Sequence, residues 1–96
     1  MKKLLLATIL TIGSTSAYAD EQKDECLFAH QLATAIMKNR QLEEELPRMI
    51  KIANGNKAIE QVVLMAYDRP AFSLEKNQKR EVKEFANKIY AQCKGL

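Results

Sequence analysis

The sequence has no tryptophan, a single histidine and only two cysteines among its 96 residues. So few chemically active side chains leave little material for a catalytic constellation, and the length allows one small domain. The cysteines do not form a Cys-x-x-Cys pair, so thioredoxin-type redox chemistry and covalent haem attachment are both unsupported. A Gly-rich phosphate-binding loop is also missing. We therefore expect a protein that is not an enzyme and has no cofactor.

The first residues have the three parts of a secretory signal. A short basic start precedes a mainly apolar run over residues 4–12, and residues 17–19 (Ala-Tyr-Ala) place small side chains where a signal peptidase reads. The run is about half of the roughly 20 residues that a membrane span requires. We predict a signal peptide over residues 1–19, cleavage after Ala19, a mature domain of residues 20–96, and a periplasmic or secreted location.

Removing this segment changes the charge balance. The whole sequence has 15 Lys+Arg against 12 Asp+Glu, and the loss of Lys2 and Lys3 lowers the formal net charge from +3 to +1. A nearly neutral exported chain does not indicate nucleic-acid binding. No later stretch is apolar enough to span a bilayer, so stable membrane insertion is not expected after signal cleavage. We expect the partner to be an envelope or secreted protein.

Export also affects the interpretation of the two cysteines. In an oxidising compartment they allow one intramolecular disulfide, Cys26 to Cys93. On the chain-entropy model a bridge of this span stabilises the fold by about 4 kcal/mol. A domain of this size buries only about 60–65% of its unfolded surface, so such a contribution can decide whether it folds.

Apolar periodicity predicts four helices, because no segment alternates with period two and no Gly-rich or Pro-rich linker divides the chain. The expected elements are a helix over 22–40, a short helix over 46–53 closed by Asn54-Gly55, a third capped by Asn56 and ended by Asp68-Arg69-Pro70, and a fourth capped by Ser73. We predict an all-α fold, a compact four-helix domain closed by one disulfide between the first and last helices.

The predicted core is the set of apolar stripes on these helices. Its members are Cys26, Ala29, Leu32, Ala33, Ile36 and Met37; Leu46, Met49, Ile50 and Ala53; Ile59, Val62, Val63, Ala66 and Tyr67; and Val82, Phe85, Ala86, Ile89, Tyr90 and Cys93. Both cysteines fall on these stripes, so both are expected to point inward.

The single histidine is a candidate metal ligand. His30 lies four residues after Cys26 on the same side of the first helix, and Cys93 would complete three ligands for zinc or copper. Disulfide formation uses both sulfurs, so we expect instead a partly buried histidine beside the bridge, and no metal site. A bridged cysteine is also not a nucleophile.

Acidic residues at 43–45 and a basic outer face on the last helix have two interpretations each. Three consecutive helical carboxylates point in different directions, which favours a solvated surface over a calcium site, with Glu44 spaced for a pair with Arg48.

The basic face of the last helix suits anionic lipid or an acidic partner. Glu-before-Lys spacing at Glu75–Lys79 and Glu84–Lys88 instead suits a solvated helix. The basic side chains are those of Lys76, Lys79, Arg80, Lys83 and Lys88.

The segment 66–73 (Ala-Tyr-Asp-Arg-Pro-Ala-Phe-Ser) joins the last two helices. Packing and helix termination explain much of it: Tyr67 belongs to the core stripe, and Arg69 suits a helix C-terminus. The alternative is a recognition corner in which Arg69 contacts a carboxylate or a partner backbone. Tyr67, Arg69 and Phe72 are therefore candidate interaction residues.

These features together resemble a family. The signal, Cys26 early in the first helix, the Ile52-Ala53 pair, the 66–73 segment and a cysteine near the C-terminus resemble a group of small exported bacterial and phage-associated helical proteins with two cysteines. The resemblance implies a small, disulfide-closed helical domain and carries no activity. A looser likeness, in size, export and single disulfide, is to the acid-stress chaperones of the periplasm.

The function expected from the sequence is that of a non-enzymatic periplasmic or secreted binding or protein-interaction module. The alternative is a small periplasmic stress chaperone that holds unfolded clients.

Overall fold

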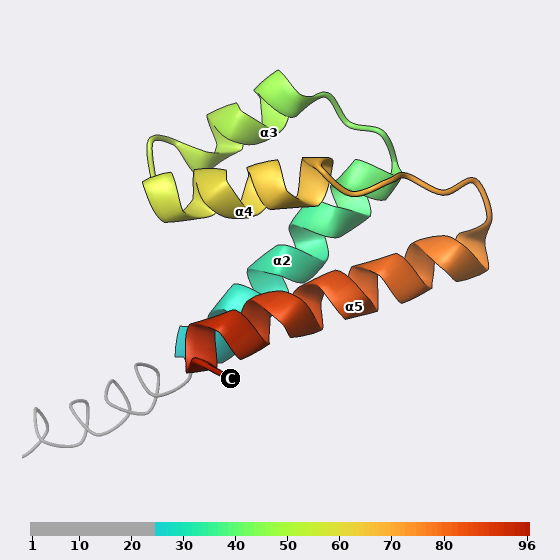
Figure 1. Cartoon of the computed structure of the whole chain (residues 1–96). Helices are drawn as coiled ribbons and strands as arrows, with labels where there is room; N and C mark the ends of the chain where they lie inside the picture. The colour runs from blue at the N-terminus through green and yellow to red at the C-terminus, as the bar shows by residue number, and fades with distance from the viewer. Residues whose placement is uncertain (1–24) are drawn as a thin grey trace, which may run out of the picture.

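A computed structural model of the chain describes residues 25–96. Within them the chain forms four helices and no strand (Figure 1), which confirms the all-α class. The helices are α2 (Glu25–Gln41), α3 (Leu46–Ala53), α4 (Lys57–Tyr67) and α5 (Glu75–Lys94). The predicted signal peptide, its cleavage site and the expected start of the first helix at residue 22 lie outside the described residues.

The helices are arranged as a hairpin, α3–α4, packed on an antiparallel pair, α2–α5. Helix α4 lies against both α3 and α2, and α2 packs along α5. Figure 1 shows the start of α2 beside the end of α5, and the connector from α4 to α5 passing the far end of α2. The first and last helices of the described chain are therefore neighbours along their length.

The predicted disulfide is confirmed at one end of this pair. Cys26 and Cys93 are bridged, and their Cα atoms lie 5.5 Å apart. The expectation that both side chains point inward is wrong, because Cys26 is half-buried and Cys93 is exposed. Their positions near the two helix ends place the sulfurs beyond the packed interior, where the bridge fastens the helices without filling the core.

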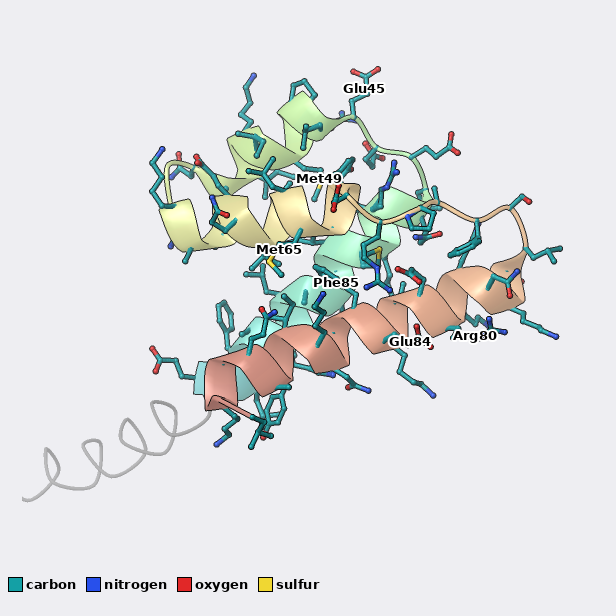
Figure 2. All side chains as sticks on the ribbon, viewed as in Figure 1. Glu45, Met49, Met65, Arg80, Glu84 and Phe85 are labelled. Atoms are coloured by element: carbon teal, nitrogen blue, oxygen red, sulfur yellow. A yellow bond between two sulfur atoms is a disulfide. The ribbon has the colours of Figure 1, made fainter. Side chains whose placement is uncertain are left out.

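The core lies where α2, α4 and α5 meet, with α3 covering α4. Its largest fully buried side chains are Phe85, Met37 and Val63. Figure 2 shows Phe85 projecting from α5 toward α2, and Met49 lying between α3 and α4. The other buried hydrophobic residues are Ala33, Ile36, Ala53, Ala66, Ala86 and Ile89, all of which belong to the predicted stripes.

Three of the predicted helix boundaries are confirmed. Asn54 adopts a left-handed conformation (φ 52°) at the end of α3 and Gly55 follows with φ 83°. The side chain of Asn56 accepts a hydrogen bond from the backbone N–H of Ile59, which caps α4. Asp68 forms the C-cap of α4, as the sequence predicts.

The predicted cap of the last helix is wrong. The N-cap of α5 is Leu74, and no side chain caps this end. Phe72, two residues before this N-cap, is held through both of its backbone polar groups, by Gln41 and by Gln78. The chain is thereby directed into α5 one residue later than the serine-cap pattern implies.

Candidate functional site

The connector over residues 68–74 is fastened to α2 by a buried glutamine. The side chain of Gln41 donates from Nε2 to the carbonyl of Pro70 at 2.9 Å and accepts at Oε1 from the N–H of Phe72 at 2.8 Å. Gln41 is one of two buried polar or charged residues among those described. An amide side chain suits this place because it offers a donor and an acceptor at once.

Arg69, a predicted interaction residue, contacts a carboxylate of its own chain. Its Nε donates to Oε2 of Glu81, which is the second buried polar residue, and its Nη2 lies 4.0 Å from Oε1 of Glu84. The hydrogen bond to Glu81 is the main reason that the pKa of Arg69 is raised. The pair ties the connector to α5 as Gln41 ties it to α2.

Tyr67 is placed in a similar network at the end of α4. Its hydroxyl donates to the carbonyl of Glu44 at 2.5 Å, and the guanidinium of Arg40 lies over its ring, 5.1 Å from the centroid. Arg40 also donates from Nε to the carbonyl of Arg69 at 2.9 Å. Burial raises the pKa of Tyr67, Arg40 opposes this, and Glu44 adds to the rise.

Phe72 is the third predicted interaction residue and is half-buried in the connector. Gln78 donates from Nε2 to its carbonyl at 2.6 Å, and Gln41 accepts from its N–H. The structure thus brings Tyr67, Arg69 and Phe72 together at the far end of the α2–α5 pair. The polar groups that sequence reasoning assigned to a partner are engaged there in contacts within the chain.

A second feature lies along the α2–α5 pair, and it is an open groove of about 580 Å³. Most of the surface exposed in this groove is non-polar, although many of the lining residues carry a polar group at the end of the side chain. Both helices contribute to the lining. The lining residues are His30, Thr34, Lys38, Gln41 and Leu42 from α2 and the turn after it, and Glu75, Gln78, Lys79, Val82, Lys83 and Ala86 from α5. The disulfide lies at one end of this helix pair, and the Gln41 contacts lie at the other.

Leu42 stands out among the groove residues. It directly follows α2, its amide donates to the carbonyl of Lys38 at 3.0 Å, and 70% of its surface is exposed. The next residue, Glu43, has a left-handed backbone (φ 63°) and turns the chain toward α3. An exposed leucine beside an apolar groove adds non-polar surface that a ligand can cover.

The charges at the groove are mainly positive. Lys79 pairs with Glu75 at 3.5 Å, which confirms one predicted ion pair of the last helix. Within the described chain, neither Lys38 nor Lys83 has an ion-pair partner. The groove therefore carries two lysines on opposite helices that form no ion pair within residues 25–96.

The other expected surface pairs have mixed outcomes. Glu44 and Arg48 form the predicted pair at 3.0 Å. The predicted pair of Glu84 with Lys88 is absent among the described ion pairs, because Glu84 lies toward Arg69. Figure 2 shows Glu84 and Arg80 on α5, and neither lines the groove.

His30 lies at the groove end nearer the disulfide. Its Nε2 is 3.2 Å from Oδ1 of Asn87, and its ring meets the ring of Tyr90 edge-on, with centroids 6.1 Å apart. Within residues 25–96, no group of three His, Cys, Asp or Glu side chains is placed to hold a metal ion. The bridged sulfurs of Cys26 and Cys93 are not thiolates, so they supply neither a nucleophile nor a soft metal ligand.

Sequence reasoning missed Gln41 and the groove for different reasons. Gln41 occupies a position of the apolar stripe of α2, four residues after the buried Met37, and a lone polar residue on such a stripe is a signal for a buried hydrogen-bonding role. The groove depends on how closely α2 and α5 approach each other, and helical periodicity in the sequence does not predict the distance between two helices. Lys79 and Lys83 were predicted only as part of the basic face of the last helix, and Lys38 was not singled out.

Comparison with family models, curated proteins and solved structures finds no match to this chain. No helix of the described part is sufficiently long and apolar to cross a bilayer. The α2–α5 groove and the fastened connector are the two candidate functional features of residues 25–96.

Proposed function

We propose that this protein is an exported, non-enzymatic protein-interaction module, and that it binds its partner through the α2–α5 groove. The observation that carries the proposal is the groove itself, an open and mainly apolar surface between two long helices. Apolar grooves between helices are common binding sites for protein segments. The exposed Leu42 at its edge adds area for such contact.

The contacts that hold the two helices beside the groove support a binding role. The disulfide joins α2 and α5 at one end, and Gln41 and Arg69 fasten the α4–α5 connector at the other. A groove whose walls are held in place loses little conformational entropy when a partner binds. The candidate residues Tyr67, Arg69 and Phe72 do not line the groove, and they serve the module by holding the connector at one end of the α2–α5 pair.

The proposed location is the periplasm or the exterior of the cell. It rests on the N-terminal sequence pattern and on the disulfide, which forms and persists in oxidising compartments. The measurement is the intact mass of the protein recovered from the periplasm, which should fit residues 20–96 with two hydrogens missing. A mass retaining residues 1–19, or one with free thiols, would contradict it.

Site-specific photocrosslinking in living cells tests the binding role. A photoreactive amino acid at Leu42 should yield adducts with another protein, whereas the same group at Ile52 should not, because Ile52 is exposed on α3 and lies outside the groove. Equal adducts from both positions, or none from Leu42, would count against the groove as the binding surface.

A chaperone that holds unfolded clients is the second candidate function. Large apolar side chains are exposed at positions spread over the described chain, and such surface can adsorb unfolded segments. They are Leu27, Phe28, Leu42, Ile52, Leu64, Leu74 and Leu96. A turbidity assay of a model client across acidic and neutral pH distinguishes the two functions, because a specific module leaves client aggregation unchanged.

A further inference from the structure

We propose that the α2–α5 groove receives an acidic amphipathic helix of a partner protein. This inference rests on the proposed function and specifies the chemistry of the partner. Three properties of the groove carry it: the spacing of the residues on its walls, its apolar floor, and the lysines on its two rims.

The walls of the groove follow helical ridges. His30, Thr34 and Lys38 are spaced four residues apart on α2, and Glu75, Lys79 and Lys83 repeat that spacing on α5. Rows at this spacing form the ridges between which a neighbouring helix packs. Each row spans about 12 Å, which matches about two turns of a partner helix. A helix lying between the rows would complete a three-helix arrangement.

A helix fits the groove better than an extended strand does. A strand needs a sheet edge to pair with its backbone polar groups, and residues 25–96 contain no strand. A helix satisfies its own backbone and presents only side chains. A small molecule is also disfavoured, because the groove is open along one side, whereas pockets for such ligands enclose most of the ligand surface.

The apolar part of the groove lining favours a partner helix that has an apolar face. Val82 in the lining is half-buried and Ala86 beside it in the lining is buried, whereas Leu42 presents a largely exposed side chain at one end. The methylene stems of lysines at the rim add non-polar area while their ammonium groups stay in water. A partner helix would therefore place leucine-like residues at i, i+3, i+4 and i+7 toward the groove.

The rims select an acidic partner. Lys38 stands on α2 and Lys79 and Lys83 on α5, while the one lining carboxylate is Glu75. Glutamates along the two flanks of a docked helix would meet these lysines, whereas lysines there would be repelled. Such rim charges steer association and select between partners more than they add affinity.

Peptide binding to the purified, oxidised protein tests this charge selection. The probe is a labelled 14-residue helical peptide, a length of about four turns, with leucines on one face and glutamates on the other. One control keeps the leucines and replaces every glutamate by lysine, and a second keeps the glutamates and replaces the leucines by serine. Fluorescence anisotropy should show the acidic peptide binding about tenfold more tightly than the lysine peptide, with no binding of the serine peptide.

A double charge reversal assigns this binding to the groove. K38E/K83E should weaken the acidic peptide about tenfold and reverse the preference. The matched control K51E/K88E makes the same net charge change at two exposed lysines that do not line the groove, and it should leave binding unchanged. Circular dichroism and thermal unfolding of all variants exclude loss of the fold as the cause. Equal binding of acidic and basic peptides, or equal weakening by both double variants, would overturn the inference.

The crosslinked partner separates failure of this inference from failure of the proposed function. A Leu42 adduct that maps to an acidic amphipathic helix supports both. An adduct that maps to a basic or extended segment of another protein overturns the inference and leaves the interaction module standing. Adducts only with a second copy of this chain, or binding only to vesicles of anionic lipid, overturn both.

Discussion

The side chain of Gln41 binds the backbone on both sides of Ala71, accepting from Phe72 N–H and donating to the Pro70 carbonyl. Through this pair of bonds, the last residue of α2 directs the chain into α5. One side chain thus satisfies a backbone donor and a backbone acceptor of an irregular segment, as a neighbouring strand does for a strand in a sheet.

Replacing Gln41 should loosen this end of the molecule. Gln41→Ala leaves the Phe72 N–H and the Pro70 carbonyl without their partners, so the free energy of unfolding should fall by about 2–3 kcal/mol. Gln41→Glu keeps the acceptor but loses the donor. Urea denaturation measures the free energy of unfolding of both variants. The control is Gln31→Ala, which replaces an exposed glutamine of α2. Equal stability of Gln41→Ala and Gln31→Ala would contradict the role assigned to Gln41.

Removing Arg69 should destabilise the fold more than its half-buried position implies. Its partner Glu81 is 8% exposed at the side chain and would keep a charge without a partner, which costs about 2–3 kcal/mol. Arg69→Met should therefore be less stable than the double variant Arg69→Met/Glu81→Leu, which removes that charge.

The control for this prediction is an ion pair at the surface. Arg48 forms a pair with Glu44, but its side chain is 71% exposed, so Arg48→Met should change stability by less than about 1 kcal/mol. Thermal unfolding of the three variants provides the comparison. A double variant no more stable than Arg69→Met would show that the charge of Glu81 is not what makes the loss costly.

Tyr67 should make stability sensitive to alkaline pH. Its pKa in the folded protein is raised above the ordinary 10.0, mainly because burial disfavours the phenolate. The folded state thus keeps the proton after the unfolded chain has released it. Tyr67 therefore leaves stability unchanged below pH 10.0 and lowers it as the pH rises through and above that value.

Ultraviolet absorbance and urea denaturation across alkaline pH test this prediction. Tyr67→Phe should lose the late-titrating phenol and reduce the alkaline fall in stability. At neutral pH it should cost about 1 kcal/mol, because the hydrogen bond to the Glu44 carbonyl is lost. An alkaline fall of the same size in both proteins would assign the effect to other groups.

The disulfide should contribute strongly to stability although it lies outside the core. Cys26 and Cys93 are 67 residues apart in sequence, so the bridge removes many conformations from the unfolded chain. Cys26→Ser/Cys93→Ser should lower the free energy of unfolding by about 4 kcal/mol. Denaturation with and without reductant measures this, and reductant should affect the native protein alone. A native protein that is equally stable with reductant would contradict the prediction.

The sequence by itself determined the helices and the faces that they bury. Periodic apolar residues such as Val63 and Phe85 identified the buried faces, and Asn54 and Asn56 marked helix ends, because these signals act over three or four residues. The bridge between Cys26 and Cys93 followed from there being two cysteines in a chain with a predicted export signal. These properties depend on local geometry or on simple counting.

The tertiary structure alone decided how the connector and the groove are built. The Gln41, Arg69 and Tyr67 contacts join residues 29, 12 and 23 positions apart in the chain, and no local pattern encodes such distances. Phe72, which directly precedes Ser73, is held by Gln41 and Gln78, and the N-cap of α5 is Leu74. The groove exists because α2 and α5 pack side by side. The same packing places lysines of the two helices on opposite walls of the groove.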